Sequence, residues 1–216
     1  MIENIGPMIY KGESIYNTGA GGGGGGGGDL PEVEILGKKY HYIQIGMFLY
    51  TAENLDYIDG NLEDDIVYHG DFYVKKAITP PGNIENAGRL YNDWASRYID
   101  NLLLDTGWSC PTYTAISQLK SSSITNARAK YLQPNDKYSW VSTGDEPNGI
   151  YNFNALAVGY WDYGNIIGQG TTARFQGVYD SSQQFFWLDQ SQYITNGSGS
   201  STGTVARSIR LCKYIG

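Results

Sequence analysis

Short runs of β-branched and aromatic residues, separated by turn residues, dominate the pattern of the chain. Residues 39–45 (Lys-Tyr-His-Tyr-Ile-Gln-Ile) form such a run and end at Gly46, so they predict a strand. Residues 48–51 predict its hairpin partner. From Trp140 onward, aromatic runs alternate with Gly, Asn, Asp and Ser, and residues 209–214 predict a closing strand.

Two segments between these strands predict helices. In residues 90–99, Leu90, Trp94 and Tyr98 stand four residues apart, and we expect them on one helix face. Residues 111–119 begin with a proline, which is favoured in the first turn of a helix. Strands before and after two helices predict an α+β domain with much irregular loop.

The first 28 residues have a different character. Residues 21–28 are an unbroken glycine run after Gly19-Ala20, and glycine has no side chain to bury in a core. As a coil the eight glycines would span about 16 Å. As an extended threefold helix they would span about 25 Å, and three copies side by side could supply its hydrogen bonds. We therefore divide the chain into 1–18, a linker or stalk at 19–28, and a domain at 29–216.

The segment 1–18 is too short to fold alone and too apolar for a solvated tail. An unstructured terminus is the alternative to a docking role. We expect it to be an attachment peptide that anchors the chain to an assembly through its apolar residues, which are Ile2, Ile5, Met8, Ile9, Tyr10, Ile15 and Tyr16.

Composition narrows the range of partners. The 216 residues carry a net charge of −7, which repels nucleic acid and anionic lipid. Apolar runs are far shorter than the ~20 residues of a spanning helix, so we expect no membrane insertion. Residues 1–7 contain an acid and a Gly-Pro pair where a secretion signal would be apolar, which predicts synthesis in the cytoplasm.

Few residues offer catalytic or metal chemistry. The two cysteines, Cys110 and Cys212, are expected to be buried thiols, and His41 and His69 fit no metal motif. Residues 59–65 alternate oxygen ligands as a calcium loop does, but lack its glycine and final glutamate. Residues 146–148 (Glu-Pro-Asn) copy a tripeptide that binds calcium and mannose in some lectins. We expect no cofactor and no catalytic residues, with calcium as the alternative.

Aromatic residues are dense between positions 160 and 193, and alternate ones are expected in the core, with Phe185 and Trp187 on the face opposite to that of Phe186. Not all of them fit inside a domain of this size, so an exposed subset would form a sugar- or protein-binding face. The candidate ligand face comprises Tyr160, Trp161, Tyr163, Trp187 and Tyr193.

Several blocks resemble, in order, the Fibrobacter succinogenes major paralogous domain, a branch of the C-type lectin-like fold. They are 40–46 (Tyr-His-Tyr-Ile-Gln-Ile-Gly) with 51–55 (Thr-Ala-Glu-Asn-Leu), 88–95 (Gly-Arg-Leu-Tyr-Asn-Asp-Trp-Ala), 107–112 (Gly-Trp-Ser-Cys-Pro-Thr), 152–160 (Asn-Phe-Asn-Ala-Leu-Ala-Val-Gly-Tyr) and 208–213 (Ser-Ile-Arg-Leu-Cys-Lys). The chain departs from this family where Ser109 replaces a histidine and Cys110 follows Trp108 instead of preceding the Gly-Trp pair. The resemblance therefore does not carry over the family's disulfide to Cys212.

The resemblance implies a scaffold that presents irregular loops to glycans or protein targets, as some phage receptor-binding proteins of this fold do. With the attachment peptide and glycine run, it predicts a non-enzymatic virion protein, a phage head or tail fibre or decoration. We expect a homotrimer anchored to other virion proteins, which displays a lectin-like head to a host glycan or surface protein. A bacterial cell-surface adhesin is the alternative, and an enzyme of the formylglycine-generating type, using Cys110 and Cys212, is the weaker one.

Overall fold

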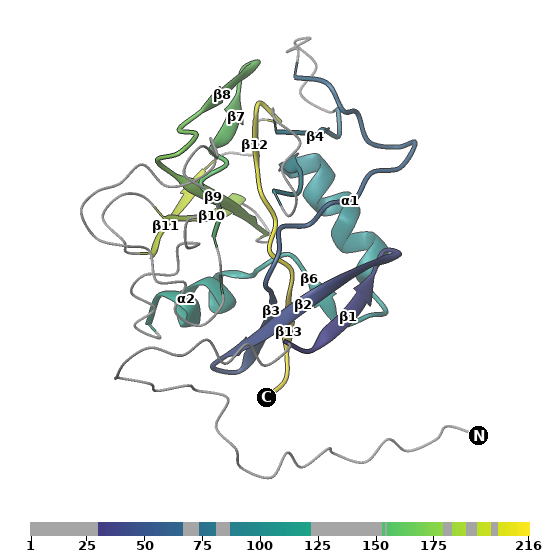
Figure 1. Ribbon diagram of the computed structural model, residues 1–216, viewed down its shortest axis with the longest axis vertical. Helices are drawn as coiled ribbons and strands as arrows, with labels where there is room; N and C mark the ends of the chain where they lie inside the picture. The colour runs from purple at the N-terminus through teal and green to yellow at the C-terminus, as the bar shows by residue number, and fades with distance from the viewer. Residues whose placement is uncertain are drawn as a thin grey trace.

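The structure is a computed structural model that describes residues 30–66, 74–80, 87–121, 153, 155–178, 183–188, 194–199 and 203–216. The predicted attachment peptide and glycine run lie outside these residues, as do residues 146–148. The described chain folds into two helices and several small antiparallel sheets, so the predicted α+β class is confirmed (Figure 1).

The first and last segments build one sheet with the strand order β1-β2-β3-β13-β6. Its strands are β1 (Glu32–Ile35), β2 (Lys38–Ile45), β3 (Phe48–Thr51), β6 (Trp108–Ser109) and β13 (Cys212–Tyr214). The predicted hairpin at 39–51 is confirmed, with Ile45 paired to Phe48 across the turn. The closing strand is shorter than predicted because residues 209–211 leave the ladder.

The middle of the chain builds two further sheets. The order β4-β5-β12-β7-β8 joins β4 (Ala77–Ile78), β5 (Leu90–Asn92), β12 (Val205–Arg207), β7 (Tyr160–Asp162) and β8 (Asn165–Ile167). The order β11-β10-β9 joins β11 (Ile194–Gly199), β10 (Gln183–Leu188) and β9 (Ala173–Gly177). Single bridges from Gly159 to Ala173 and from Phe175 to Ser208 connect the two sheets.

Helix α1 (Asp93–Leu103) begins three residues later than the spacing predicts. Asn92 has extended backbone angles and accepts a hydrogen bond from the Ala95 amide, so it caps the helix. Leu90 lies in β5, whose three residues are all buried, and the predicted face of Leu90, Trp94 and Tyr98 is wrong. The helix instead buries Ala95, Ser96, Ile99 and Leu103 together with Asp93.

The second helix is confirmed as α2 (Tyr113–Ser121), two residues after the predicted start. The Thr112 hydroxyl accepts a hydrogen bond from the Ala115 amide at 3.3 Å, which supplies the N-terminal cap. Ala115, Ile116 and Leu119 are fully buried in the same hydrophobic cluster as Tyr50. The Tyr50 hydroxyl donates to the Ala115 carbonyl at 2.8 Å and fixes α2 against the first sheet.

Arg210 stands where the sheets meet, and only 1% of it is exposed. Its Nε donates to Asn54 Oδ1 at 2.6 Å, and its Nη1 donates to the carbonyls of Thr51 and Ala52. The guanidinium carbon lies 5.0 Å from the ring of Phe153 and 5.7 Å from that of Phe175. We call this group the Arg210 junction, and it lies where the strand is interrupted at residues 209–211.

The folded domain, which we call the head, has two distinct ends along its long axis (Figure 1). The chain enters beside β2, where the Tyr42 amide donates to the Pro31 carbonyl at 3.0 Å, and Leu30 packs against the core. This end also holds β13 and the C-terminus, and we call it the tether end. The β7–β8 hairpin lies at the opposite end, which we call the far end.

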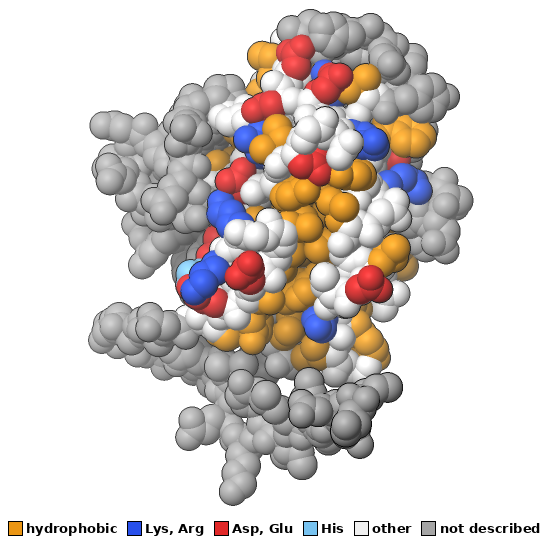
Figure 2. All heavy atoms as spheres, turned by 90° about the vertical axis from the view of Figure 1, so that its right-hand side faces the viewer, with side chains coloured by type: hydrophobic (Ala, Val, Ile, Leu, Met, Phe, Trp, Pro, Cys, Tyr) orange, Lys and Arg blue, Asp and Glu red, His pale blue; other side chains and the backbone are white. Residues whose placement is uncertain are grey.

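Hydrophobic side chains also gather in a band on the side of the head that carries β1 and α1, between charged side chains (Figure 2). On these elements Val33 and Tyr98 are partly buried against the core, while Leu102 is exposed. Leu104, directly after α1, is 75% exposed. The band is thus the partly exposed edge of the hydrophobic cluster that α1 covers.

Asn92 provides a test of this architecture because its buried amide makes four hydrogen bonds. Its Oδ1 accepts from the amides of Lys76 and Ala95, and its Nδ2 donates to the carbonyls of Val74 and Gly203. Asn92→Ala removes a helix cap and leaves buried backbone groups unpaired, so we expect a loss of about 3 kcal/mol in the free energy of unfolding. Urea denaturation measures it.

The matched control is Asn101→Ala, an exposed position on the same helix. It should change the free energy of unfolding by less than about 0.5 kcal/mol. Equal effects of the two substitutions would contradict the structural role assigned to Asn92.

Candidate functional site

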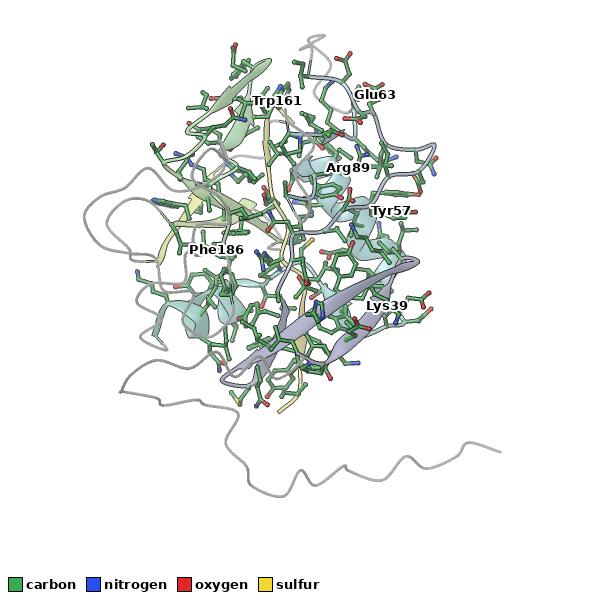
Figure 3. The ribbon with its side chains drawn as sticks, in the orientation of Figure 1. Lys39, Tyr57, Glu63, Arg89, Trp161 and Phe186 are labelled. Atoms are coloured by element: carbon green, nitrogen blue, oxygen red, sulfur yellow. The ribbon has the colours of Figure 1, made fainter. Side chains whose placement is uncertain are left out.

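The five aromatic residues of the predicted ligand face are not equivalent in the structure. Tyr163 is 55% exposed at the tip of the β7–β8 hairpin, and Tyr160 and Trp187 are half-buried. Trp161 is fully buried, and its Nε1 donates to the Ile66 carbonyl at 2.8 Å, so it belongs to the core (Figure 3). Tyr193 lies outside the described residues.

Tyr163 has a positive φ of 43°, followed by Gly164 with a φ of 90°. Two successive positive φ values are the requirement of the two-residue turn that joins Asp162 to Asn165. A bulky residue in this region costs about 1–2 kcal/mol relative to glycine or asparagine. The hairpin tip therefore holds an exposed tyrosine side chain on a strained backbone.

Alternation along β9 and β10 separates a core face from an outer face. Phe175 and Phe186 point inward, where their rings stack with centroids 4.8 Å apart. The outer face carries Phe185 and Trp187, whose rings stack at 5.5 Å. The predicted alternation around Phe186 is therefore confirmed, since Phe186 is fully buried whereas Phe185 and Trp187 are half-buried.

The outer face of β9 and β10 meets one face of β7 and β12. The Arg174 guanidinium lies 3.7 Å from the centroid of the Tyr160 ring, and the Arg207 guanidinium lies 4.2 Å from that of Phe185. Arg207 Nη1 also donates to Gln176 Oε1 at 2.8 Å. The five residues Tyr160, Arg174, Phe185, Trp187 and Arg207 form what we call the arginine–aromatic site.

Cation–π contact explains how two guanidiniums are held beside one another. Each lies over an aromatic ring that attracts positive charge, and each is oriented by that ring. Burial, followed by the positive charge of Arg174, lowers the pKa of Arg207 to about 10. The charges of Asp162 and Asp93 act in the opposite direction. At neutral pH Arg207 therefore stays protonated in a site that holds charges of both signs.

A glycine on the neighbouring strand gives the aromatic pair its position. A Cβ at Gly197 of β11 would stand 2.9 Å from Phe185 Cζ and 3.1 Å from Trp187 Cζ3. Both distances are shorter than ordinary van der Waals contact, so a side chain at position 197 would displace the rings. The absence of a side chain lets Phe185 and Trp187 lie flat over β11.

Both cysteines are buried free thiols, as the sequence predicts. Cys110 Sγ is 3.8 Å from the Ser96 carbonyl oxygen, and Cys212 Sγ is 4.0 Å from Ser109 Oγ. Burial raises the pKa of Cys110 well above its ordinary value and that of Cys212 to about 12. The thiolate that a cysteine nucleophile or metal ligand requires is therefore scarce at neutral pH.

The acidic segment 59–65 uses its oxygens within the protein. Asp59 accepts hydrogen bonds from the hydroxyls of Tyr57 at 2.9 Å and Tyr98 at 2.6 Å, and the bond from Tyr98 lowers the pKa of Asp59. Asp64 Oδ2 is 2.8 Å from Arg89 Nη1. Figure 3 shows Tyr57 and Arg89 on the opposite side of the head from Phe186, so this cluster is separate from the arginine–aromatic site.

The histidine that the structure describes, His41, pairs with a carboxylate, at 2.6 Å from its Nδ1 to Glu53 Oε1. In the described part of the chain, no three His, Cys, Asp or Glu side chains gather in a way that could hold a metal ion. None of the helices described there has the length and apolar character needed to cross a bilayer. Residue His69 lies outside the described ranges.

The pattern of the sequence did not identify Arg174 or Arg207 as site residues. Both stand in short strands whose alternation is visible, since Arg174 precedes Phe175 and Arg207 follows Ala206. That alternation could have predicted two arginines on outward faces. Which outward faces meet depends on strand pairing between residues 160–162 and 205–207, which no local pattern encodes.

Comparison with models of protein families, with curated proteins and with solved structures finds no match for this chain. The arrangement of its own residues is therefore the basis of the functional proposals that follow.

The buried thiols make a prediction about reactivity. At pH 8 the native protein should react with the thiol reagent DTNB at least about a hundredfold more slowly than the protein unfolded in guanidinium chloride, because burial limits both access and ionisation. Two thiols should react after unfolding. A thiol that reacts in the native protein at the unfolded rate would contradict the burial of Cys110 and Cys212.

The same pKa values predict a pH dependence. A thiol whose folded pKa is raised stabilises the fold fully below its unfolded value, near pH 8.5, and loses this contribution as pH rises toward the folded value of about 12 for Cys212. The free energy of unfolding should therefore fall above pH ~9, and Cys212→Ala should reduce the slope.

Proposed function

We propose that this chain is a non-enzymatic display protein of a phage particle, which anchors through residues 1–18 and presents a lectin-like head to the host surface. The observation that carries the proposal is that the head has two different, opposite ends. The chain enters at the tether end, and the exposed Tyr163 stands at the far end with Tyr160 on the same hairpin. A tethered receptor-binding head needs this arrangement.

The proposal of a C-type lectin-like fold draws support from the Arg210 junction. Arg210, Asn54 and Phe153 come from three separate blocks that resemble the major paralogous domain, and they meet in this junction. Gly88, from a fourth block, has a positive φ and would bring a Cβ within 2.5 Å of the Leu55 carbonyl oxygen. Residues from separate blocks of the resemblance thus pack together where distant segments of the fold meet.

The glycine run is the basis for the oligomeric state that we propose. Three extended glycine chains can exchange the backbone hydrogen bonds that a single one lacks, so we propose a homotrimer with a threefold stalk at residues 19–28. The eight glycines of such a stalk would span about 25 Å and hold three heads away from the particle, with their tether ends toward it. The mass of the purified protein in solution tests this state.

Deletion of residues 2–18 tests the anchor. We expect the deleted chain to fold normally and to be lost from assembled particles, because its apolar contact with other virion proteins is gone. Circular dichroism checks the head, and quantification of the chain in purified particles checks incorporation.

A matched control keeps the length and removes the apolar chemistry. It replaces Ile2, Ile5, Met8, Ile9, Tyr10, Ile15 and Tyr16 by serine, and it should also fail to be incorporated. Normal incorporation of either variant would refute anchoring by this peptide.

A further inference from the structure

We propose that the arginine–aromatic site binds the carboxylate of an acidic sugar, with Arg174 as the residue that receives it. This inference rests on the proposed function, because it names the chemical class of glycan that the head would recognise. The proposed ligand site lies between two sheets and does not depend on the anchor or the stalk.

The state of Arg174 is the first reason. Among the described residues its guanidinium has no ion pair and no side-chain hydrogen bond, and its Nε is buried without a partner. The ring of Tyr160 at 3.7 Å fixes the plane of the guanidinium, whose edge meets no acceptor among the described residues. A fixed guanidinium edge matches the two oxygens of a carboxylate.

Local charge is the second reason. Among the described residues, the charged groups that act on Arg207 are the guanidinium of Arg174 and the carboxylates of Asp162 and Asp93. Arg97 and Asp93 pair at 3.0 Å, so the remaining three groups leave one positive charge. A single negative charge would balance it, which favours a carboxylate over the dianion of a phosphate monoester.

The aromatic rings are the third reason. Arg207 covers the Phe185 ring, whereas the half-buried Trp187, stacked beside Phe185, stands directly opposite Arg174 in the ladder. Aromatic rings offer an apolar face to the C–H face of a sugar, while the adjacent guanidinium takes a charged substituent. Asp162 Oδ1, a buried acceptor without a hydrogen-bond partner among the described residues, could receive a sugar hydroxyl.

Two ligands that differ only in the carboxylate separate this proposal from general sugar binding. The probes are methyl β-D-glucuronide and methyl β-D-glucoside, added to the full chain and followed by saturation-transfer NMR and by the shifts of the arginine Nε–H resonances. We expect the glucuronide to bind at millimolar concentration and to shift the Arg174 resonance. The glucoside should bind at least about tenfold more weakly, since a charge-assisted pair is lost.

Substitution of the arginine is the second arm. Arg174→Gln should weaken binding of the glucuronide about tenfold or more, and Arg174→Lys, which keeps the charge but not the planar fork, should fall between it and the wild type. Lys39→Gln, which removes an exposed positive charge on β2, should bind as the wild type does. Thermal unfolding of each variant shows whether the fold is intact.

Three results would overturn the inference: equal binding of the two glycosides, no binding of the glucuronide by the wild type, or full binding by folded Arg174→Gln. Equal binding would leave a glycan-binding head in place and reject its preference for acids. Loss of incorporation on deleting residues 2–18 is independent of all three, so failure here is distinguishable from failure of the proposed anchor.

Discussion

The buried guanidinium of Arg210 is the constraint on which the rest of the head depends. Removing a cation from water is costly, and the structure offsets this cost with backbone carbonyls, the Asn54 amide and two aromatic rings. Burial lowers the pKa of Arg210 to about 9, so it remains charged at neutral pH. Its partners come from the end of β3, from residue 153 and from β9, and the junction therefore locks three distant segments together.

The position of the candidate site follows from this junction. Two residues before Arg210, the Ser208 amide donates to the Arg174 carbonyl and the Ser208 carbonyl accepts from the Gln176 amide. These bonds hold β12 beside β9, and Arg207 of the one strand thereby faces the outer side of the other. The two arginines of the site are brought together by a backbone contact adjacent to the core cation.

The sequence pattern correctly predicted those elements whose structure depends on residues close together in the chain. The hairpin at 39–51, the second helix and the alternation around Phe186 all follow from residue type and spacing. The start of α1 did not follow from residue type and spacing, because Asn92 caps the helix while Leu90 pairs in β5. Partners far along the chain set these two roles. Trp161 was predicted at a ligand face because its neighbours are aromatic, yet its side of β7 faces the core.

The proposed function requires that the head present its far end to the host and its tether end to the particle. Because both native thiols are buried, an introduced surface cysteine can be labelled selectively with a maleimide polymer. Tyr163→Cys labels the far end and Met47→Cys the tether end, at side chains that are 55% and 45% exposed. This orientation predicts that polymer at position 163 blocks adsorption of particles to host cells and that polymer at position 47 does not. Blocking only from position 47, or from neither, would contradict it.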